Sequence, residues 1–367
     1  MRAKALGSIL FALLILINTS IFTSVEASGE ISLESAIEKA ISNSKELKLY
    51  DDKITYAKQS YDLTYAKSAS AMAKGWDDDA GLISNKKEEL LYPLQGKNQI
   101  DQLVWEKQNK AKLLERDVTK AYYEILNKNT LISLREKSVK RLQNEFEIKK
   151  QQVKGGTAVQ STVTSLQISI NQEQQKVNSL VRERDVQIIK LNGLLGLELN
   201  SNIKLKKVDI PVKSMDNINI DKTAEGQNLG NHDILKAQKA LEEARLEYDI
   251  VKKYSYKPDT NGLNEVEDSV LDAEYTLEEL KKNINVKVRS DFNALLNLRD
   301  DIEINNLEWE KTKKLSEISA VKFKLGQITL VDFEKVKANE DEAQMALEKA
   351  KLDYLTSYDT FKTNFIN

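Results

Sequence analysis

The sequence predicts an all-α protein built from two tandem long helical hairpins, each a helix–turn–helix coiled coil. Apolar residues recur at spacings of three and four over long stretches, which is the pattern of a coiled-coil seam. Only three prolines and thirteen glycines in 367 residues interrupt those stretches. Two short glycine-containing segments, 154–157 and 324–327, each end one long helical stretch and precede another. The hairpins are therefore expected to turn at these segments.

Composition narrows the classes of function. The chain has 55 basic and 57 acidic residues, a formal net charge of −2, so nothing favours a nucleic-acid partner. It has no cysteine, which excludes disulfides, thiol nucleophiles and sulfur-ligated metals.

The N-terminus, residues 1–27, has the pattern of a signal peptide. Arg2 and Lys4 precede an apolar run at 9–17, and Val25-Glu26-Ala27 fits a small-x-small cleavage site. The apolar run is short for the alternative, an uncleaved membrane anchor. The mature chain is therefore expected to be exported.

The first repeat is expected to span 28–200. Ser32 is a candidate N-cap for a helix that continues to about Met72. The helical pattern lapses between positions 75 and 96, which we interpret as a loop or short helices. A long helix is expected over about 98–152, and the returning helix ends at Gly196, where glycine can adopt the left-handed cap conformation.

The second repeat is expected to span 231–367, after a linker at 201–230 that holds Pro211 and in which a short strand is a candidate. The segment VTKAYYEILN (118–127) corresponds to VRSDFNALLN (288–297), an offset of 170 positions. The same offset carries Gly156 onto Gly326. A fixed offset of this kind favours an internal duplication.

The two turns are the candidate functional sites. A tight turn between helices needs a residue that tolerates positive φ, which explains the glycines. Apolar side chains beside the turns, expected to be exposed, would offer contact area to a partner protein. The candidate docking residues are Lys154, Gly155, Gly156, Thr157, Val159, Phe323, Lys324, Leu325, Gly326, Gln327, Ile328 and Leu330.

Five segments in order carry recognisable motifs: ISLESAI (31–37), NSKEL (43–47), AYYEIL (121–126), LLG (194–196) and FKLGQITLVD (323–332). They resemble the motifs Leu-Thr-Leu-Glu-x-Ala, Asn-x-Pro-Glu-Leu, Ala-Tyr-x-x-Leu, Leu-Leu-Gly and Arg-Tyr-x-x-Gly-x-x-Ser-x-x-Asp of the TolC family of outer-membrane efflux proteins. Lys45 stands where that family usually has proline. The resemblance covers nearly the whole mature chain.

This resemblance implies a homo-oligomer, a trimer, whose two-repeat protomers build an α-helical tunnel. It implies two partners, an adaptor (membrane-fusion) protein docked at the tips and an ABC or RND-type transporter. It implies a place in the outer membrane and periplasm, or on the extracytoplasmic surface if the organism lacks an outer membrane. Family members also carry a β-barrel, but neither 73–97 nor 254–264 alternates as membrane strands do, so we expect little or no β-barrel.

The gate motif of the family is also altered. The family has a tyrosine before the tip glycine and an arginine after it, where this chain has Phe323 and Ile328. Asp332 matches the first of two lumen aspartates and Lys335 replaces the second. Asp332 is therefore either a lumen-facing residue or a first-turn residue in a capping arrangement with Thr329, and we favour the capping role.

Few residues are candidates for chemistry, and we expect no enzyme, cofactor or metal site. His232 is the only histidine and has no signalled partners, so a structural role is expected. The Asp77-Asp78-Asp79 run lacks the spaced ligands and glycine of a calcium loop. Aromatic residues at the ends opposite the tips would either anchor at a membrane interface or pack over the helix ends: Trp76, Tyr92, Tyr254 and Tyr256.

The expected function is a tunnel or docking component of a cell-envelope efflux or secretion system. The alternative is an exported coiled-coil scaffold or interaction protein of the cell surface without channel activity. The sequence does not indicate a transported substrate.

Overall fold

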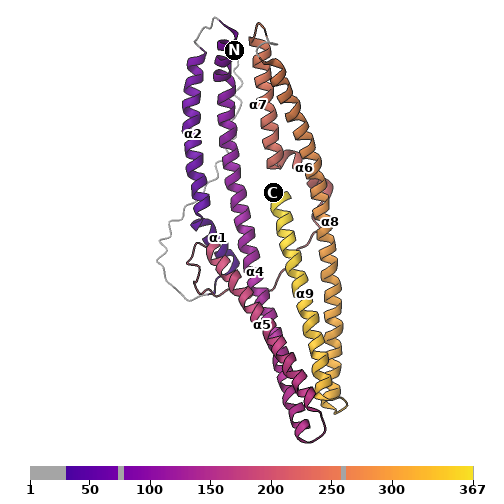
Figure 1. Ribbon diagram of the computed structural model, residues 1–367. Helices are drawn as coiled ribbons and strands as arrows, with labels where there is room; N and C mark the ends of the chain where they lie inside the picture. The colour runs from indigo at the N-terminus through magenta and orange to yellow at the C-terminus, as the bar shows by residue number, and fades with distance from the viewer. Residues whose placement is uncertain (1–29, 73–77, 258–261, 367) are drawn as a thin grey trace, which may run out of the picture.

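The computed structural model describes residues 30–72, 78–257 and 262–366, which form an elongated bundle of long helices (Figure 1). The prediction of an all-α chain is confirmed for these residues, whose one β pairing is an isolated bridge between Ile31 and Leu205. The predicted signal peptide lies outside the described residues. In the described part of the chain, no helix combines the length and apolar character needed to cross a membrane.

The described helices lie in the order expected of two hairpins. The predicted first repeat contains α1 (Leu33–Asn43), α2 (Lys45–Ala71), α3 (Asp79–Lys86), a π-helical turn η1 (Lys87–Leu91), α4 (Tyr92–Lys154) and α5 (Gln160–Leu194). The second contains α6 (Ile220–Gly230), α7 (His232–Tyr254), α8 (Leu263–Lys324) and α9 (Leu330–Phe365).

The first predicted helix is divided at Ser44. The Ser44 side chain accepts a hydrogen bond from the backbone N–H of Leu47 at 3.2 Å, and its backbone is extended with ψ 112°. A serine that caps the next helix ends the previous one without needing the family's proline. Periodicity alone missed this break, because the apolar spacing continues across it.

The predicted lapse at 75–96, interpreted as a loop or short helices, is helical from Asp79 onward. Helix α3, the π-helical turn and α4 follow one another without a gap from Asp79, and α4 begins at Tyr92 instead of position 98. Pro93 lies in the first turn of α4, directly after the π-helical turn. The proline therefore stands at a junction between helical segments and does not open a loop.

The predicted linker is also shorter than expected, because α6 occupies its last eleven residues. Asn219 caps α6 by accepting a hydrogen bond from the N–H of Lys222 at 2.9 Å. The non-helical segment before α6 is pinned to the bundle by two buried tyrosines. The Tyr122 hydroxyl donates to the carbonyl oxygen of Lys206 at 2.8 Å, and that of Tyr354 donates to Lys213 at 2.5 Å.

Burial in this position raises the pKa of Tyr122 to about 12, so the hydroxyl stays a donor at every physiological pH. The core divides into two main clusters. One holds Tyr122 and residues mostly from the first half of the chain, with Leu355 of α9, and the other holds Tyr354 and residues from position 215 onward.

The long helices form a single row. In the half that holds the turns the order is α5, α4, α9, α8, and in the other half it is α2, α4, α7, α8 (Figure 1). Helices α4 and α8 therefore run through both halves. One edge of the row is α8 over its whole length, and the other is α5 in one half and α2 in the other.

Candidate functional site

The two hairpin turns have the same backbone geometry. Gly156 has φ 75° and Gly326 has φ 73°, the left-handed conformation that glycine adopts without strain. In each turn the residue after the glycine donates its N–H to the carbonyl oxygen five positions earlier, at 2.8 Å for Thr157 and 2.9 Å for Gln327. This is a Schellman C-cap, which satisfies the last carbonyls of the preceding helix. The 170-residue offset seen in the sequence thus relates two turns of one conformation.

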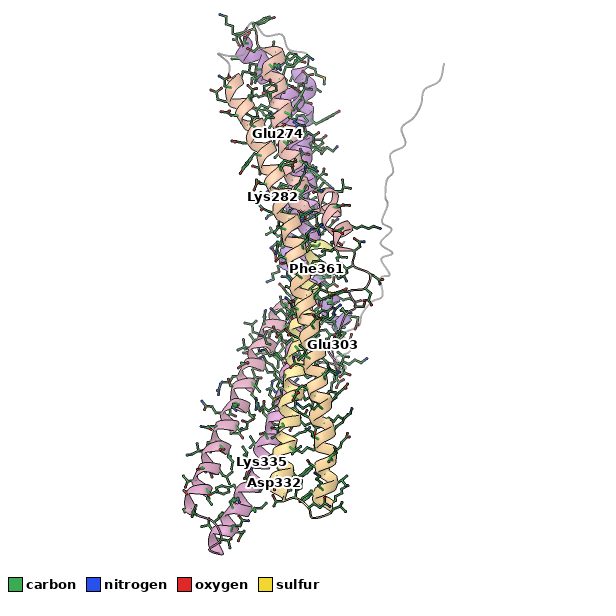
Figure 2. The ribbon with its side chains drawn as sticks, turned by 90° about the vertical axis from the view of Figure 1, so that its right-hand side faces the viewer. Glu274, Lys282, Glu303, Asp332, Lys335 and Phe361 are labelled. Carbon is green, nitrogen blue, oxygen red and sulfur yellow. The ribbon has the colours of Figure 1, made fainter. Side chains whose placement is uncertain are left out.

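The helices that leave the two turns begin differently. The Thr329 hydroxyl donates to a carboxylate oxygen of Asp332 at 2.7 Å and accepts from the N–H of Asp332 at 3.1 Å. These hydrogen bonds with Thr329 lower the pKa of Asp332. Asp332 is therefore a capping residue of α9, seen in its first turn in Figure 2. At the other turn Val159 precedes α5 and provides no side-chain cap.

The apolar surface of the turns is smaller than predicted. Val159 and Leu325 are 66% and 67% exposed, whereas Ile328 and Leu330 are half-buried, so the prediction that these two are exposed is wrong. The physical reason is that Ile328 and Leu330 lie where the chain leaves the turn and begins α9, beside the other helices of the row. Phe323 stacks on Phe333 of α9, with ring centroids 5.5 Å apart, and is 37% exposed.

The other candidate docking residues lie on the surface of the two turns. Lys154 and Lys324 end α4 and α8, and Gly155 and Leu325 are the C-cap residues that follow them. Each is exposed, as are Thr157 and Gln327. Whether these residues bind a partner stays a prediction.

Both tips lie at the same end of the molecule, and the α4–α5 tip extends beyond the α8–α9 tip (Figure 1). Seen from the side, the two hairpins diverge toward their tips (Figure 2). A partner that approaches this end meets two similar turns side by side.

Above the tips, the two hairpins are joined by charged contacts between α4 and α9. Arg141 lies 2.6 Å from Asp341 and 3.7 Å from Glu334, and the Arg141 and Asp341 side chains are 14% and 12% exposed. Arg135 contacts Glu342 of α9 and, at 2.9 Å, Glu173 of α5. We call the contacts of Arg135 and Arg141 with α9 the fork. Sequence reasoning missed the fork, since it followed apolar positions and the fork is polar.

In the aspartate run, Asp78 caps the N-terminus of α3, and Asp79 links the start of α3 to the segment that follows α7. Asp78 caps α3 by accepting from the N–H of Gly81 at 2.6 Å. One carboxylate oxygen of Asp79 accepts from the N–H groups of Tyr256 and Lys257 at 2.7 and 3.0 Å. Asp77 lies outside the described residues. Over the described ranges, no group of three or more histidine, aspartate or glutamate side chains is arranged to hold a metal ion.

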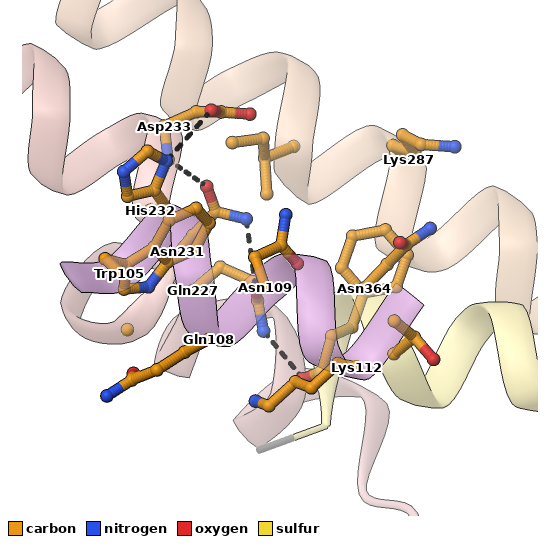
Figure 3. Close-up of a pocket in the computed structure, with 14 residues that line it drawn as sticks. Trp105, Gln108, Asn109, Lys112, Gln227, Asn231, His232, Asp233, Lys287 and Asn364 are labelled. Carbon is orange, nitrogen blue, oxygen red and sulfur yellow. Dashed lines mark hydrogen bonds and ion pairs between the residues drawn. The ribbon is translucent and has the colours of Figure 1, made fainter. Parts of the chain in front are cut away.

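His232 begins α7 and stacks on Trp105 of α4, with ring centroids 3.1 Å apart and planes 7° apart (Figure 3). The pair forms one wall of a cavity of about 270 Å³ that is lined mainly by amide and ammonium groups. Burial is the largest effect on His232 and lowers its pKa, while Asp233 acts in the opposite direction. His232 therefore packs as a neutral ring between the two repeats, which fits the structural role expected for it.

The aromatic residues opposite the tips divide between the two expected roles. Tyr254 packs beside Ile250 and Val251 in a small cluster, with the Lys86 ammonium 5.2 Å from its ring. Tyr92 and Tyr256 are 43% and 87% exposed. Trp76 lies outside the described residues. Tyr254 thus packs over the helix ends, and the interfacial role stays a prediction for the two exposed tyrosines.

Several solved bacterial outer-membrane channels have a similar arrangement of helices. The chain is similar to the outer-membrane channel OprN, with a TM-score of 0.69 and 10% identity over 91% of this chain and 89% of that one. It is also similar to the CmeC outer membrane channel of Campylobacter jejuni (TM-score 0.62, 13% identity, 91% and 85% covered). The outer membrane protein VceC of Vibrio cholerae is a third (TM-score 0.62, 10% identity, 91% and 97% covered).

No protein-family model matches the sequence, and no curated protein is significantly similar to it. The chain thus has the fold of TolC-type outer-membrane channels, as the five sequence motifs indicated. The similar structures are channels rather than enzymes.

Proposed function

We propose that this chain is the tunnel or docking component of a cell-envelope efflux or secretion system. Several copies, three by resemblance, would stand side by side so that their helix rows enclose a tunnel. The chain would carry no reaction of its own and would act by contact and by enclosing a path for solutes.

The observation that carries this proposal is the pair of matching turns at one end of the molecule. Two tips with one backbone conformation offer a partner two turns of the same shape, and copies around an axis would repeat them further. Val159 and Leu325, both about two-thirds exposed, supply the apolar contact at each tip. The partner that fits is an adaptor of the membrane-fusion type, itself coupled to an ABC or RND-type transporter.

Site-specific photocrosslinking in the producing cell tests this proposal. A benzophenone amino acid replaces Leu325 in one strain and Val159 in another, and in a control strain it replaces Leu229, which is 83% exposed at the end of α6. We expect the two tip positions, and not the control, to capture a protein with a long helical hairpin. The alternative, a surface scaffold, predicts no product that is specific to the tips.

A further inference from the structure

A groove lies between α2 and α4 in the half of the molecule away from the tips. The two helices run side by side there (Figure 1), and the groove has a volume of about 360 Å³. This volume lies in the range of sites that bind small molecules. The π-helical turn η1 contributes Glu88 to the lining, and turns of this kind often occur at functional sites.

Two tyrosines supply aromatic surface, one from each side of the groove. Tyr61 of α2 lies against Gly96 of α4, where an added Cβ atom would be 3.1 Å from Cδ2 of the Tyr61 ring. Glycine inside a helix is unfavourable relative to alanine, and the close approach of Tyr61 gives this glycine a packing role. Tyr92, at the start of α4, lines the same groove and is 43% exposed. The groove therefore has aromatic surface that a ligand can reach.

Hydrogen-bonding side chains stand beside the tyrosines. Gln95 and Gln99 follow Tyr92 by three and seven positions, so all three lie on one face of α4. Ser60 of α2 adds a hydroxyl group on the opposite side. Among the residues that the structure describes, none accepts a hydrogen bond from the Gln95 or Gln99 amide or donates one to it. Both amides are therefore available to a ligand, each as donor and acceptor.

The charges of the lining balance. One carboxylate, that of Glu88, and one ammonium group, that of Lys67, line the groove. Within the described ranges, neither of them takes part in an ion pair. A ligand with a net charge of either sign would gain little from a lining of this kind, so a neutral ligand is favoured.

The lining also disfavours an apolar ligand and a metal ion. Among the described residues that form it, no aliphatic side chain is larger than that of Ala57, so a lipid chain would find little to pack on. The part of the chain that the structure describes holds no group of three or more potential metal ligands here or elsewhere. The ligand that fits is neutral, has one apolar face and carries several hydroxyl groups.

We propose that this groove binds a pyranose unit of a neutral glycan. A pyranose ring has a C–H face, which the electron-rich face of an aromatic ring attracts, and hydroxyl groups at its rim. Tyr61 and Tyr92 take the C–H face, and Gln95, Gln99 and Glu88 bond the hydroxyl groups. The predicted signal peptide fits such a ligand, because glycans are abundant outside the cytoplasm. The proposal goes beyond the tunnel and does not depend on it.

Isothermal titration calorimetry of the full mature chain tests this proposal with two soluble hexasaccharides. One is cellohexaose, made of glucose, and the other is chitohexaose, made of N-acetylglucosamine. We expect at least one of them to bind with a Kd of about 1 mM or below. Titration with hexaglycine, a flexible chain of amides without sugar rings, is expected to give no heat of binding.

Substitutions in the groove identify the site of binding. Tyr92→Ala is expected to weaken binding about tenfold, because the exposed aromatic surface is lost. Gly96→Ala is expected to weaken it several-fold, because the new methyl group displaces the Tyr61 ring. The matched control is Tyr56→Ala, since Tyr56 is 69% exposed on another face of α2, five positions before Tyr61. Circular dichroism confirms that each variant is folded, and an equal affinity in Tyr92→Ala and Tyr56→Ala overturns the proposal.

Co-sedimentation with insoluble polysaccharide from the surface of the producing cell distinguishes two sources of the sugar. Pelleting that is lost in Tyr92→Ala and kept in Tyr56→Ala identifies a glycan of the cell surface. Binding of a hexasaccharide without such pelleting identifies a free oligosaccharide. A chain that neither binds a hexasaccharide nor pellets with the polysaccharide overturns the proposal and leaves the tunnel untouched.

Discussion

Replacing Asp341 with leucine removes the principal counter-charge of Arg141 at the fork. Both side chains are nearly buried, and the guanidinium and carboxylate are 2.6 Å apart. Removing one partner of a buried ion pair costs about 3–5 kcal/mol, because the other charge stays in a poorly solvated place.

The free-energy cost of removing Asp341 is expected to lie at the lower end of that range. Glu334 remains 3.7 Å from Arg141, and the Asp341 oxygen that faces Arg141 has no aligned hydrogen bond. We therefore expect Asp341→Leu to lower the free energy of unfolding by about 3 kcal/mol. The double variant Arg141→Met/Asp341→Leu is expected to recover to within about 1 kcal/mol of the parent, because no buried charge is left unpaired.

Chemical denaturation followed by circular dichroism measures these differences. The control is Glu342→Gln, since Glu342 is 58% exposed and Arg135 keeps Glu173 at 2.9 Å, so a loss of only about 0.5 kcal/mol is expected. Spin labels at Thr157→Cys and Gln327→Cys should report a wider separation of the tips in Asp341→Leu. An Asp341→Leu protein as stable as the control, or a double variant no more stable than the single one, would show that the Arg141–Asp341 pair does not stabilise the fork.

Three further predictions follow from the turns and from the stacked pair. Gly326→Ala is expected to lower the free energy of unfolding by about 1–2 kcal/mol because of its positive φ, whereas Gly226→Ala, which also has open space around its Cβ position, is not. The pKa of Asp332 is lowered in the folded chain, so its ionised carboxylate stabilises the fold. Asp332→Asn is therefore expected to be less stable than the parent near pH 7, and this difference should vanish as the pH falls well below about 4. Denaturation midpoints of the two proteins at each pH measure the difference. Because the pKa of His232 is lowered, stability should decrease as the pH falls below about 6.5. His232→Gln should remove that decrease, measured against the parent by tryptophan fluorescence during unfolding, to which the stacked Trp105 contributes.

The sequence predicted the hairpins well because their signals are local and repeated. The match of Gly156 with Gly326 needed only an offset in the chain, and a tight turn leaves few conformations other than the left-handed one for these glycines. The capping role favoured for Asp332 was also within reach, since Thr329 and Asp332 stand at the spacing of a capping pair.

The features that the sequence did not predict depend on contacts between residues far apart in the chain, or on helix-breaking residues that fit more than one local structure. Pro93 lies in the stretch interpreted as a loop or short helices, because proline occurs both in loops and in the first turn of a helix, and only packing decides between the two. Arg141 and Asp341 are 200 residues apart, and no local pattern shows that two charges will be buried together. Ile328 and Leu330 were expected to be exposed because they lie beside a turn. The sequence does not show how closely the chain packs on the neighbouring helices after that turn, so the half-burial of both residues could not be predicted.

Electron microscopy of the purified mature chain, viewed along the long axis of the particles, tests the proposed tunnel directly. A tunnel predicts a hollow ring of helices made of three copies, with all hairpin tips at one end. A particle of one copy, or a solid bundle without a central path at concentrations where sedimentation shows assembly, would contradict it.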